Sequence, residues 1–239
     1  MPARSSNSPV GNRALLTEHW LFAALSDAEL DRVVSHMHHR RYAPNELIFR
    51  KGDPGSSMMA IGKGRVKISS TSAEGRTVVL NILGRGEIFG EIALLDGGQR
   101  TADATAIEAT ELHVLDSRDF IPLLQRHPEI CIKLLKIFCA RLRSTSEQVE
   151  DQLFLTRPVR LAKVLLRLAA EYGHESPEGV RLEIRLSQSG IGDLAGMTRE
   201  SVNKQIAAWR DAGLVDVVDG KIVVREMERL RSLVEASLP

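Results

Sequence analysis

The stretch Phe-Gly-Glu-Ile-Ala-Leu-Leu-Asp-Gly-Gly-Gln-Arg-Thr-Ala, residues 89–102, is the most informative part of this chain. Gly90 lets the backbone approach a bound molecule, Glu91 can accept a hydrogen bond from a sugar hydroxyl, and Arg100 offers a planar guanidinium to phosphate oxygens. If residues 92–95 form one helical turn, its amides also face the anion. The stretch therefore predicts a site for a cyclic nucleotide. The alternative is a surface ion pair between Glu91 and Arg100.

The same stretch resembles the phosphate-binding cassette of the cyclic-AMP receptor protein (CRP/FNR) family of bacterial transcription regulators. In that family Gly, Glu, Arg and a Ser or Thr at this spacing hold the ligand. The resemblance implies ligand contacts from Gly90, Glu91, Ile92, Arg100, Thr101 and Ala102. We expect Arg100 to be surface-accessible, so that its removal abolishes the ligand response and spares the fold.

Composition sets the limits of the chain. Its 239 residues, 43% of them hydrophobic, suffice for one large or two small domains, and a net charge of +1 gives no electrostatic argument for nucleic acid. No apolar run approaches the ~18 residues of a membrane span, and the Ser/Asn/Pro-rich start lacks the apolar core of a signal peptide. We therefore expect a cytoplasmic protein with no membrane association. Cys131 and Cys139 are too few for a disulfide framework, and we expect buried thiols.

The pattern along the chain changes three times. A capping box at residues 26–29 predicts a short helix. Short β-rich runs separated by Gly, Asp and Pro fill residues 41–115, at 46–49, 58–61, 65–70, 77–83, 105–109 and 111–115. A helical period covers residues 130–155 and is broken at Arg157-Pro158. With the resemblance, we expect an α+β protein: a disordered tail at 1–14, a cyclic-nucleotide-binding β-roll (jelly roll) at 15–129, a dimerisation helix at 130–156 and a winged helix-turn-helix at 157–239.

The long helix carries a heptad pattern. Leu135, Leu142 and Val149 occupy one heptad position, and the other is occupied by Cys131, Phe138, Thr145 and Gln152. A seam of this kind predicts a homodimer helix, and packing of the helix against its own β-domain is the alternative.

Thr145 and Ser146 interrupt the apolar pattern of this helix. In the receptor family a Thr-Ser pair at this point reaches the adenine, one residue from each subunit, and residues 141–147 are similar to that segment. The resemblance therefore implies cyclic AMP as the allosteric ligand. Thr101 stands where Ser is common in cyclic-AMP binders, which leaves cyclic GMP open as a second ligand.

Residues 187–206 have the spacing of a helix-turn-helix. Ile191, Leu194, Ala195, Val202 and Ile206 pack the two helices, Gly196 lies at the turn, and Thr198 is the N-cap of the second helix. This packing leaves four side chains in solvent near the start of the second helix, where a major groove would meet them: Arg199, Glu200, Asn203 and Lys204. Ser187, Gln188 and Thr198 are candidate phosphate contacts.

Two further features support DNA binding over an ordinary solvated face. Residues 214–224 predict a β-hairpin with an Asp219-Gly220 turn, the wing that commonly follows this motif. Residues 197–204 also resemble the family's recognition helix, although Lys204 replaces the Arg often found there and lacks its bidentate fork.

The resemblance implies a dimeric regulator, not an enzyme, whose ligand reorients two winged domains on a palindromic operator in double-stranded DNA, with RNA polymerase as a further partner. The alternatives are the same architecture responding to cyclic GMP, redox state, haem or a metabolite, or to no ligand. His36, His38 and His39 are candidate haem or metal ligands, but a solvated basic patch with Arg40-Arg41 explains them with fewer assumptions. We predict no metal site, and a cyclic-nucleotide hydrolase would need a metal cluster or a nucleophile and base that the cassette lacks.

Overall fold

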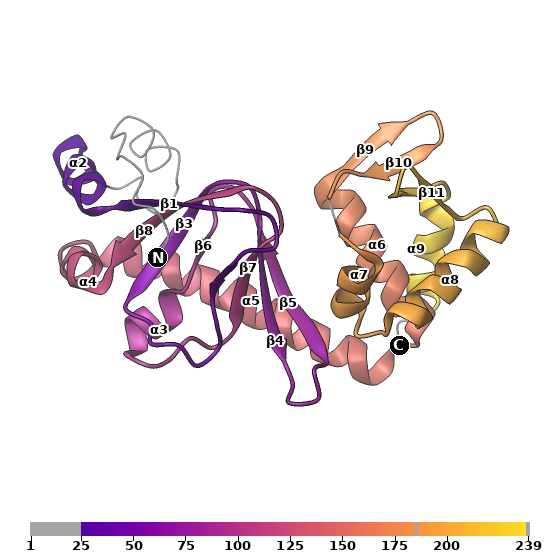
Figure 1. Cartoon of the computed structure of the whole chain (residues 1–239), viewed down its shortest axis with the longest axis horizontal. Helices are drawn as coiled ribbons and strands as arrows, with labels where there is room; N and C mark the ends of the chain where they lie inside the picture. The colour runs from indigo at the N-terminus through magenta and orange to yellow at the C-terminus, as the bar shows by residue number, and fades with distance from the viewer. Residues whose placement is uncertain (1–24, 185, 238–239) are drawn as a thin grey trace. The chain divides into compact units, whose positions relative to one another are not determined.

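The computed structural model describes residues 25–184 and 186–237, which fall into two compact units, Met1–Arg143 and Ser144–Pro239. The colour gradient of Figure 1 follows the chain through both units. No helix among the described residues is long and apolar enough to cross a membrane.

The first unit is built on two four-stranded antiparallel sheets, with strand orders β1-β8-β3-β6 and β2-β7-β4-β5 (Figure 1). Their strands are β1 (His38–Tyr42), β2 (Leu47–Phe49), β3 (Ser57–Lys63), β4 (Val66–Thr71), β5 (Thr77–Leu83), β6 (Ile88–Phe89), β7 (Asp103–Ala106) and β8 (Thr110–Asp116). The predicted β-rich runs agree with β2 to β5 and β8 to within a residue or two. The run predicted at residues 105–109 is displaced, because the strand ends at Ala106.

Successive side chains of β3 point to opposite faces of the sheet, and this alternation explains why the unit has two hydrophobic cores. Met59 and Ile61 belong to the cluster that also contains side chains from the second sheet, whereas Met58 and Ala60 belong to a cluster formed with the helices. Those helices are α2 (Asp27–His36), α4 (Ser117–Arg126) and the start of α5 (Pro128–Phe154). The first sheet is therefore buried on both faces, and the cassette at residues 89–102 begins at its β6 edge.

The predicted capping box opens α2. The backbone N–H of Ser26 donates to Glu29 Oε2 at 2.9 Å, and the Ser26 hydroxyl donates to the same oxygen at 2.6 Å. These bonds, led by the one from the Ser26 side chain, lower the pKa of Glu29 to about 2. Glu29 is therefore a carboxylate at any pH near neutrality.

The helix α5 combines a start that packs on its own unit with a set of exposed apolar side chains. Its first turns pack on the first unit through Ile130 and Leu134, while Leu135, Leu142 and Val149 are 55%, 68% and 54% exposed. Phe138, which we expect in the second seam position, is half-buried and also packs on the core of its own unit. The expectation of buried thiols is wrong for Cys139, which is exposed, and Cys131 is half-buried.

The segment of histidines and arginines before residue 42 is a strand and not merely an exposed basic patch. Strand β1 pairs antiparallel with β8, with His39 opposite His113. The side chain of His39 is only 12% exposed, and its Nε2 lies 3.3 Å from Glu111 Oε2. The sequence did not predict this strand because four of its five residues are His or Arg, which give no apolar strand pattern.

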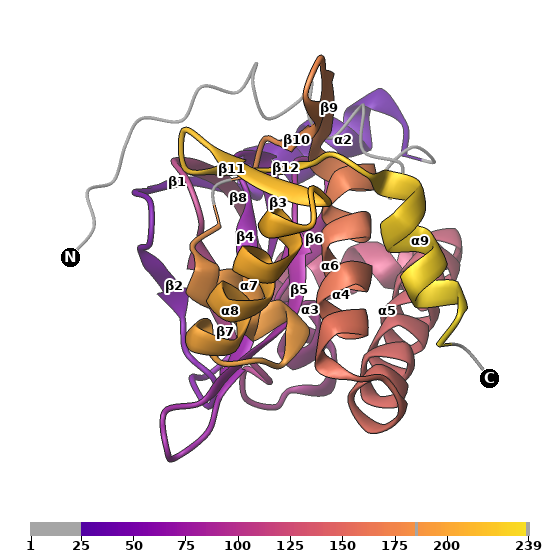
Figure 2. The same ribbon diagram turned by 90° about the vertical axis from the view of Figure 1, so that its right-hand side faces the viewer.

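The second unit combines helices with one four-stranded antiparallel sheet of order β11-β12-β10-β9. Its elements are α6 (Arg157–Tyr172), β9 (Gly173–Ser176), β10 (Gly179–Leu182), α7 (Gln188–Ala195), α8 (Arg199–Asp211), β11 (Val215–Val218), β12 (Lys221–Val224) and α9 (Met227–Glu235). Figure 2 shows α9 beside α6 and the β11–β12 hairpin above α8. Asp219 and Gly220 both take positive φ, 51° and 74°, in the predicted hairpin turn.

Candidate functional site

The cassette begins with a left-handed glycine at the end of β6. Gly90 has φ of 79° and directly precedes the short helix α3 (Glu91–Asp96), which fulfils the expectation of a helical turn after the glycine. A Cβ built on Gly90 would lie 2.6 Å from Arg100 Nη1 and 3.2 Å from the carbonyl oxygen of Ser57. Gly90 is therefore needed for its backbone conformation and because Arg100 approaches so closely.

Arg100 is held in a fixed orientation inside the first unit. Its Nη1 donates to the carbonyl oxygens of Ser57 at 2.8 Å and Gly90 at 2.6 Å, and its Nη2 donates to Ser57 Oγ at 3.1 Å. The guanidinium also lies 4.4 Å above the ring of Phe49. Burial lowers the pKa of Arg100, and the charge of Glu91 opposes this shift. A guanidinium keeps its proton in such a site, so the cassette contains a buried cation.

Glu91 supplies the opposite charge. Its side chain is almost completely buried, and Oε1 accepts a hydrogen bond from Arg141 Nη1. Arg141, on α5, also donates through Nη2 to the carbonyl oxygen of Ile88, so it ties α5 to the β6–α3 turn. Arg141 thereby fixes the orientation of the Glu91 carboxylate.

Two polar atoms of the cassette lack partners among the described residues. Glu91 Oε2 and Arg100 Nε are both buried without a hydrogen bond. Leaving a buried polar atom unpaired costs about 1–3 kcal/mol, so in native proteins a ligand or an ordered water usually completes the bond. One buried acceptor and one buried donor are thus left at this site.

Two expectations for this site are corrected. Glu91 and Arg100 do not form the surface ion pair of the alternative interpretation, because both are buried and the carboxylate pairs with Arg141. Arg100 is also not surface-accessible: it is 5% exposed and bonded to backbone carbonyls, so it contributes to the fold as well.

The other predicted ligand residues lie in different environments. Ile92 is exposed on α3, Thr101 is exposed, and Ala102, which follows Thr101, is buried. Thr145 and Ser146 are exposed on α5, in the part of that helix that belongs to the second unit. The structure therefore brings Gly90, Glu91 and Arg100 together.

Sequence reasoning missed three residues that organise the cassette: Ser57, Phe49 and Arg141. Ser57 and Phe49 lie more than forty positions before Arg100, and no local pattern connects them to it. Arg141 carried a usable signal, because it lies one helical turn before Thr145 and so shares its face of the helix.

The histidines do not gather into a metal site. Among the described residues no three His, Cys, Asp or Glu side chains are placed to hold a metal ion. His113 forms instead a tilted ring pair with His39, with centroids 5.3 Å apart. Burial, with the neighbouring His39 as the second cause, lowers the pKa of His113 to about 4. This histidine is neutral at physiological pH.

In the second unit both helix-turn-helix helices start with a hydroxyl cap. Ser187 Oγ accepts from the backbone N–H of Gly190 at 3.1 Å, and Thr198 Oγ1 accepts from that of Ser201 at 3.3 Å. Gly196 at the turn has φ of 61°. Ser187 and Thr198, which we expected to contact phosphate, are thus first of all structural caps. Gln188, the first residue of α7, is half-buried.

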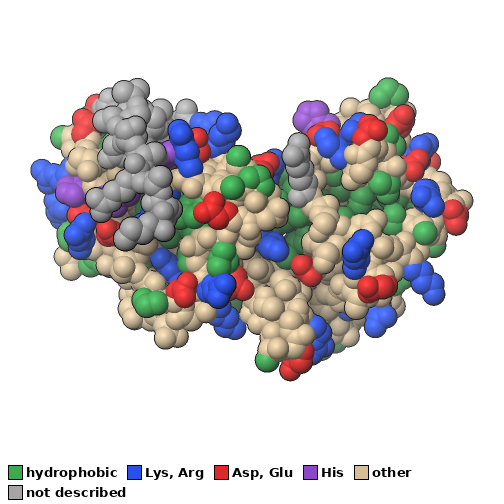
Figure 3. All heavy atoms as spheres, viewed as in Figure 1, with side chains coloured by type: hydrophobic (Ala, Val, Ile, Leu, Met, Phe, Trp, Pro, Cys, Tyr) green, Lys and Arg blue, Asp and Glu red, His purple; other side chains and the backbone are tan. Residues whose placement is uncertain are grey.

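The second helix of the helix-turn-helix, α8, has the buried face and the exposed face that its sequence predicted. Val202 and Ile206 are buried, together with Trp209, which the sequence analysis did not identify. The four candidate base-reading side chains are all exposed: Arg199, Glu200, Asn203 and Lys204. On the face drawn in Figure 3, Lys and Arg side chains alternate with Asp and Glu, which fits the net charge of +1. Any selectivity for DNA must therefore come from where individual charged and polar side chains lie, and not from the overall charge.

Arg160 is a further residue that sequence reasoning missed. Its Nε donates to the carbonyl oxygen of Ala195 at 3.1 Å and its Nη1 to that of Gln152 at 3.2 Å. One side chain of α6 thus donates hydrogen bonds to backbone carbonyl oxygens at the end of α7 and in the last turns of α5, which have no partner within their own helices.

Two family models match this chain: the cyclic nucleotide-binding domain at residues 39–127 and the Crp-like helix-turn-helix domain at residues 159–233. The chain is 32% identical over 213 residues to the cyclic AMP receptor protein of Thermus thermophilus, covering 89% of this chain and 95% of that protein. It is 29% identical over 216 residues to a CRP-like cAMP-activated global transcriptional regulator of Mycobacterium tuberculosis, covering 90% and 96%.

A solved structure shares the fold. The c-di-GMP responsive global regulator CLP of Xanthomonas campestris superposes with a TM-score of 0.73 at 24% identity, covering 83% of this chain and 99% of that one.

Proposed function

Because the chain belongs to the cyclic-AMP receptor (CRP/FNR) family of bacterial transcription regulators, we propose that it is a homodimeric regulator whose DNA binding responds to cyclic AMP. The observation that carries the proposal is the pair of unsatisfied buried atoms, Glu91 Oε2 and Arg100 Nε, on a fixed acceptor and a fixed cation. A cyclic nucleotide satisfies both, because it presents a ribose hydroxyl and a phosphate in one rigid molecule.

In this proposal the phosphate binds Arg100 and the hydroxyl of Thr101, and the ribose 2′-hydroxyl donates to Glu91 Oε2. Gly90, Ile92 and Ala102 contribute backbone and side-chain contacts around the phosphate. The fixed orientation of Arg100 by Ser57 and the Gly90 carbonyl supports this assignment, since little side-chain freedom is left to lose when the ligand binds.

We infer the dimer from α5. Its exposed Leu135, Leu142 and Val149 recur every seven residues, so they form one apolar stripe that a second copy of α5 would cover. In this dimer Thr145 and Ser146 reach the adenine, one from each subunit, as the family resemblance implies.

The exposed side chains of α8 are the proposed DNA contacts. Arg199, Glu200, Asn203 and Lys204 read base edges in the major groove, and Ser187, Gln188 and Thr198 meet phosphates. Two such helices in a dimer require a palindromic operator. Cyclic AMP acts by binding the DNA-competent arrangement more tightly, which shifts the population toward it. This role places the protein in the cytoplasm, with RNA polymerase as a further partner.

Titration calorimetry with cyclic AMP and then cyclic GMP tests the ligand. We expect cyclic AMP to bind selectively, and Arg100→Gln to weaken it at least tenfold. Arg76→Gln is the control, because this arginine is 86% exposed on the β4–β5 turn. Equal affinities for the two nucleotides would contradict the assignment of Thr145 and Ser146 to adenine. Unchanged affinity in Arg100→Gln would contradict the phosphate assignment.

A second candidate function is the same regulator with another signal. CLP, which shares this fold, is described as c-di-GMP responsive, so the fold does not determine the ligand. Fluorescence anisotropy on a panel of palindromic DNA duplexes separates the two candidates. DNA binding that rises with cyclic AMP supports our proposal, whereas DNA binding without any response to either cyclic nucleotide supports the second candidate.

A further inference from the structure

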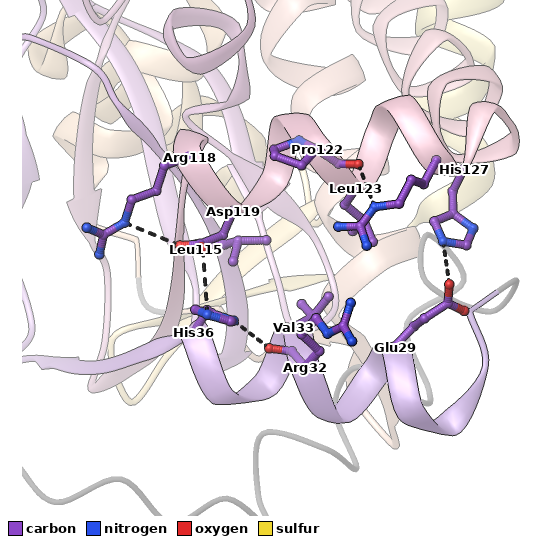
Figure 4. Close-up of a pocket in the computed structure, with 11 residues that line it drawn as sticks. Glu29, Arg32, Val33, His36, Leu115, Arg118, Asp119, Pro122, Leu123 and His127 are labelled. Atoms are coloured by element: carbon purple, nitrogen blue, oxygen red, sulfur yellow. Dashed lines mark hydrogen bonds and ion pairs between the residues drawn. The ribbon is translucent and has the colours of Figure 1, made fainter.

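A cavity of about 130 Å³ separates α2 from α4 in the first unit (Figure 4). Val33, Leu115 and Leu123 form its apolar part. A water molecule needs roughly 10–15 Å³ of such space, so the cavity has room for several waters or for a small organic molecule. It is not formed by the cassette residues.

Two arginines line this cavity without a carboxylate partner. Arg32 comes from α2 and Arg126 from α4. Arg126 donates only its Nε, to the carbonyl oxygen of Pro122 at 3.1 Å, which leaves both of its Nη groups available. Among the described contacts neither guanidinium forms an ion pair with Asp or Glu. A third arginine at the cavity, Arg118, differs because it pairs with Asp119 at 3.4 Å and with Asp116 at 3.5 Å.

The carboxylates at the cavity are already engaged elsewhere. Glu29 accepts from Ser26 and from His127 Nε2, the latter at 2.8 Å. Asp119 pairs with Arg118, and His36 Nε2 lies 3.8 Å from it. Figure 4 shows as dashed lines the contact of Glu29 with His127 and those of Asp119 with Arg118 and His36. The acidic groups thus bond to partners other than Arg32 and Arg126. Three arginines face two carboxylates at the cavity, which leaves a surplus of positive charge.

We propose that this cavity is a second ligand site, which holds a small oxyanion, carboxylate or phosphate, between Arg32 and Arg126. Each guanidinium presents a planar fork that matches two oxygens of a carboxylate or phosphate. The apolar part of the cavity accommodates a short carbon chain beside the anionic group. A molecule held in this way bridges α2 and α4, so its binding also stabilises the packing of α2 on the first unit.

The test is a titration of the full-length, ¹⁵N-labelled protein with succinate and, separately, with inorganic phosphate, against sodium chloride of equal ionic strength. We expect saturable amide chemical-shift changes in residues 29–36 and 115–127, with millimolar dissociation constants because both arginines are exposed to solvent. Arg32→Gln/Arg126→Gln weakens binding at least tenfold, whereas the control Arg76→Gln leaves it unchanged. Tighter succinate binding identifies a carboxylate as the occupant, and tighter phosphate binding identifies a phosphate.

Phosphate can also bind at Arg100, so the location of the shifts decides the outcome. Changes confined to residues 90–102 overturn the proposal, as do equal changes with sodium chloride, which would mean ionic screening only. If circular dichroism shows that the double Gln variant is unfolded, Arg32→Lys/Arg126→Lys replaces it. This variant keeps both charges without the fork, and we expect a severalfold loss of affinity. Unchanged affinity in a folded variant of either kind also overturns the proposal.

Discussion

The cassette of the first unit and the recognition helix of the second both carry charged residues but use them in opposite ways. In the cassette, Glu91 and Arg100 are buried and hold the surrounding backbone. On α8 the charged side chains are exposed, and Val202, Ile206 and Trp209 hold the helix. Binding and stability are therefore coupled in the first region and separable in the second. Substitutions ranked by their effect on the free energy of unfolding test this difference.

The largest effect is expected for Arg100→Ala. It removes three hydrogen bonds and leaves the buried carbonyl oxygens of Ser57 and Gly90 without their donor. We expect the free energy of unfolding of the first unit to fall by about 3 kcal/mol, together with the loss of nucleotide binding. Calorimetric unfolding of this variant and of the exposed control Arg76→Ala provides the measurement. A loss of binding at full stability would show that the two are not coupled here.

A comparable effect follows from acidification through His113, which is 6% exposed. Its pKa is about 4 in the folded protein and 6.5 ordinarily, so the unfolded chain takes up the proton first as the pH falls. Stability is therefore complete above pH 6.5 and decreases toward pH 4, by up to about 3 kcal/mol. Unfolding measured from pH 7.5 to 4.5 should show this slope in the wild type and a smaller one in His113→Gln. Equal slopes would exclude His113 as the cause.

A moderate effect is expected for Gly90→Ala. Gly75 is a matched control, because its φ is 78° and a Cβ there meets nothing within 4 Å. Both substitutions incur the strain of a left-handed Ala, about 1 kcal/mol. Only the one at Gly90 also displaces Arg100, so we expect roughly 1 kcal/mol of additional destabilisation and weaker nucleotide binding. Indistinguishable unfolding curves for the two variants would mean that Arg100 relaxes freely.

The smallest effect on stability is expected for Lys204→Ala. This side chain is exposed on α8, so the free energy of unfolding should change by less than about 0.5 kcal/mol. DNA affinity should nevertheless decrease by about 1–3 kcal/mol if Lys204 reads a base. Anisotropy titrations on the operator and on scrambled duplexes provide the measurement. An equal loss on both would identify Lys204 as a phosphate contact, and a change in unfolding of several kcal/mol would contradict the separation proposed for this region.

The sequence predicted the features that local chemistry determines. The capping box at Ser26, the positive-φ turn at Asp219-Gly220 and the exposed face of α8 each depend on residues a few positions apart. It did not predict what chain topology determines. Burial of Arg100 depends on Ser57 and Phe49, and β1 is a strand because β8 pairs with it. Residues 38–41 show no alternation of apolar and polar side chains that would predict this pairing.

Arg141 has a thermodynamic consequence beyond the geometry of the cassette. It connects the Glu91 carboxylate and the Ile88 carbonyl to α5, the helix with the exposed apolar stripe at Leu135, Leu142 and Val149. In the proposed dimer, any association that steadies α5 also steadies the acceptor of the ribose hydroxyl, and linkage requires the reverse to hold equally. The measured nucleotide affinity then depends on protein concentration. At high dilution, dissociation of the dimer and dissociation of the nucleotide promote each other.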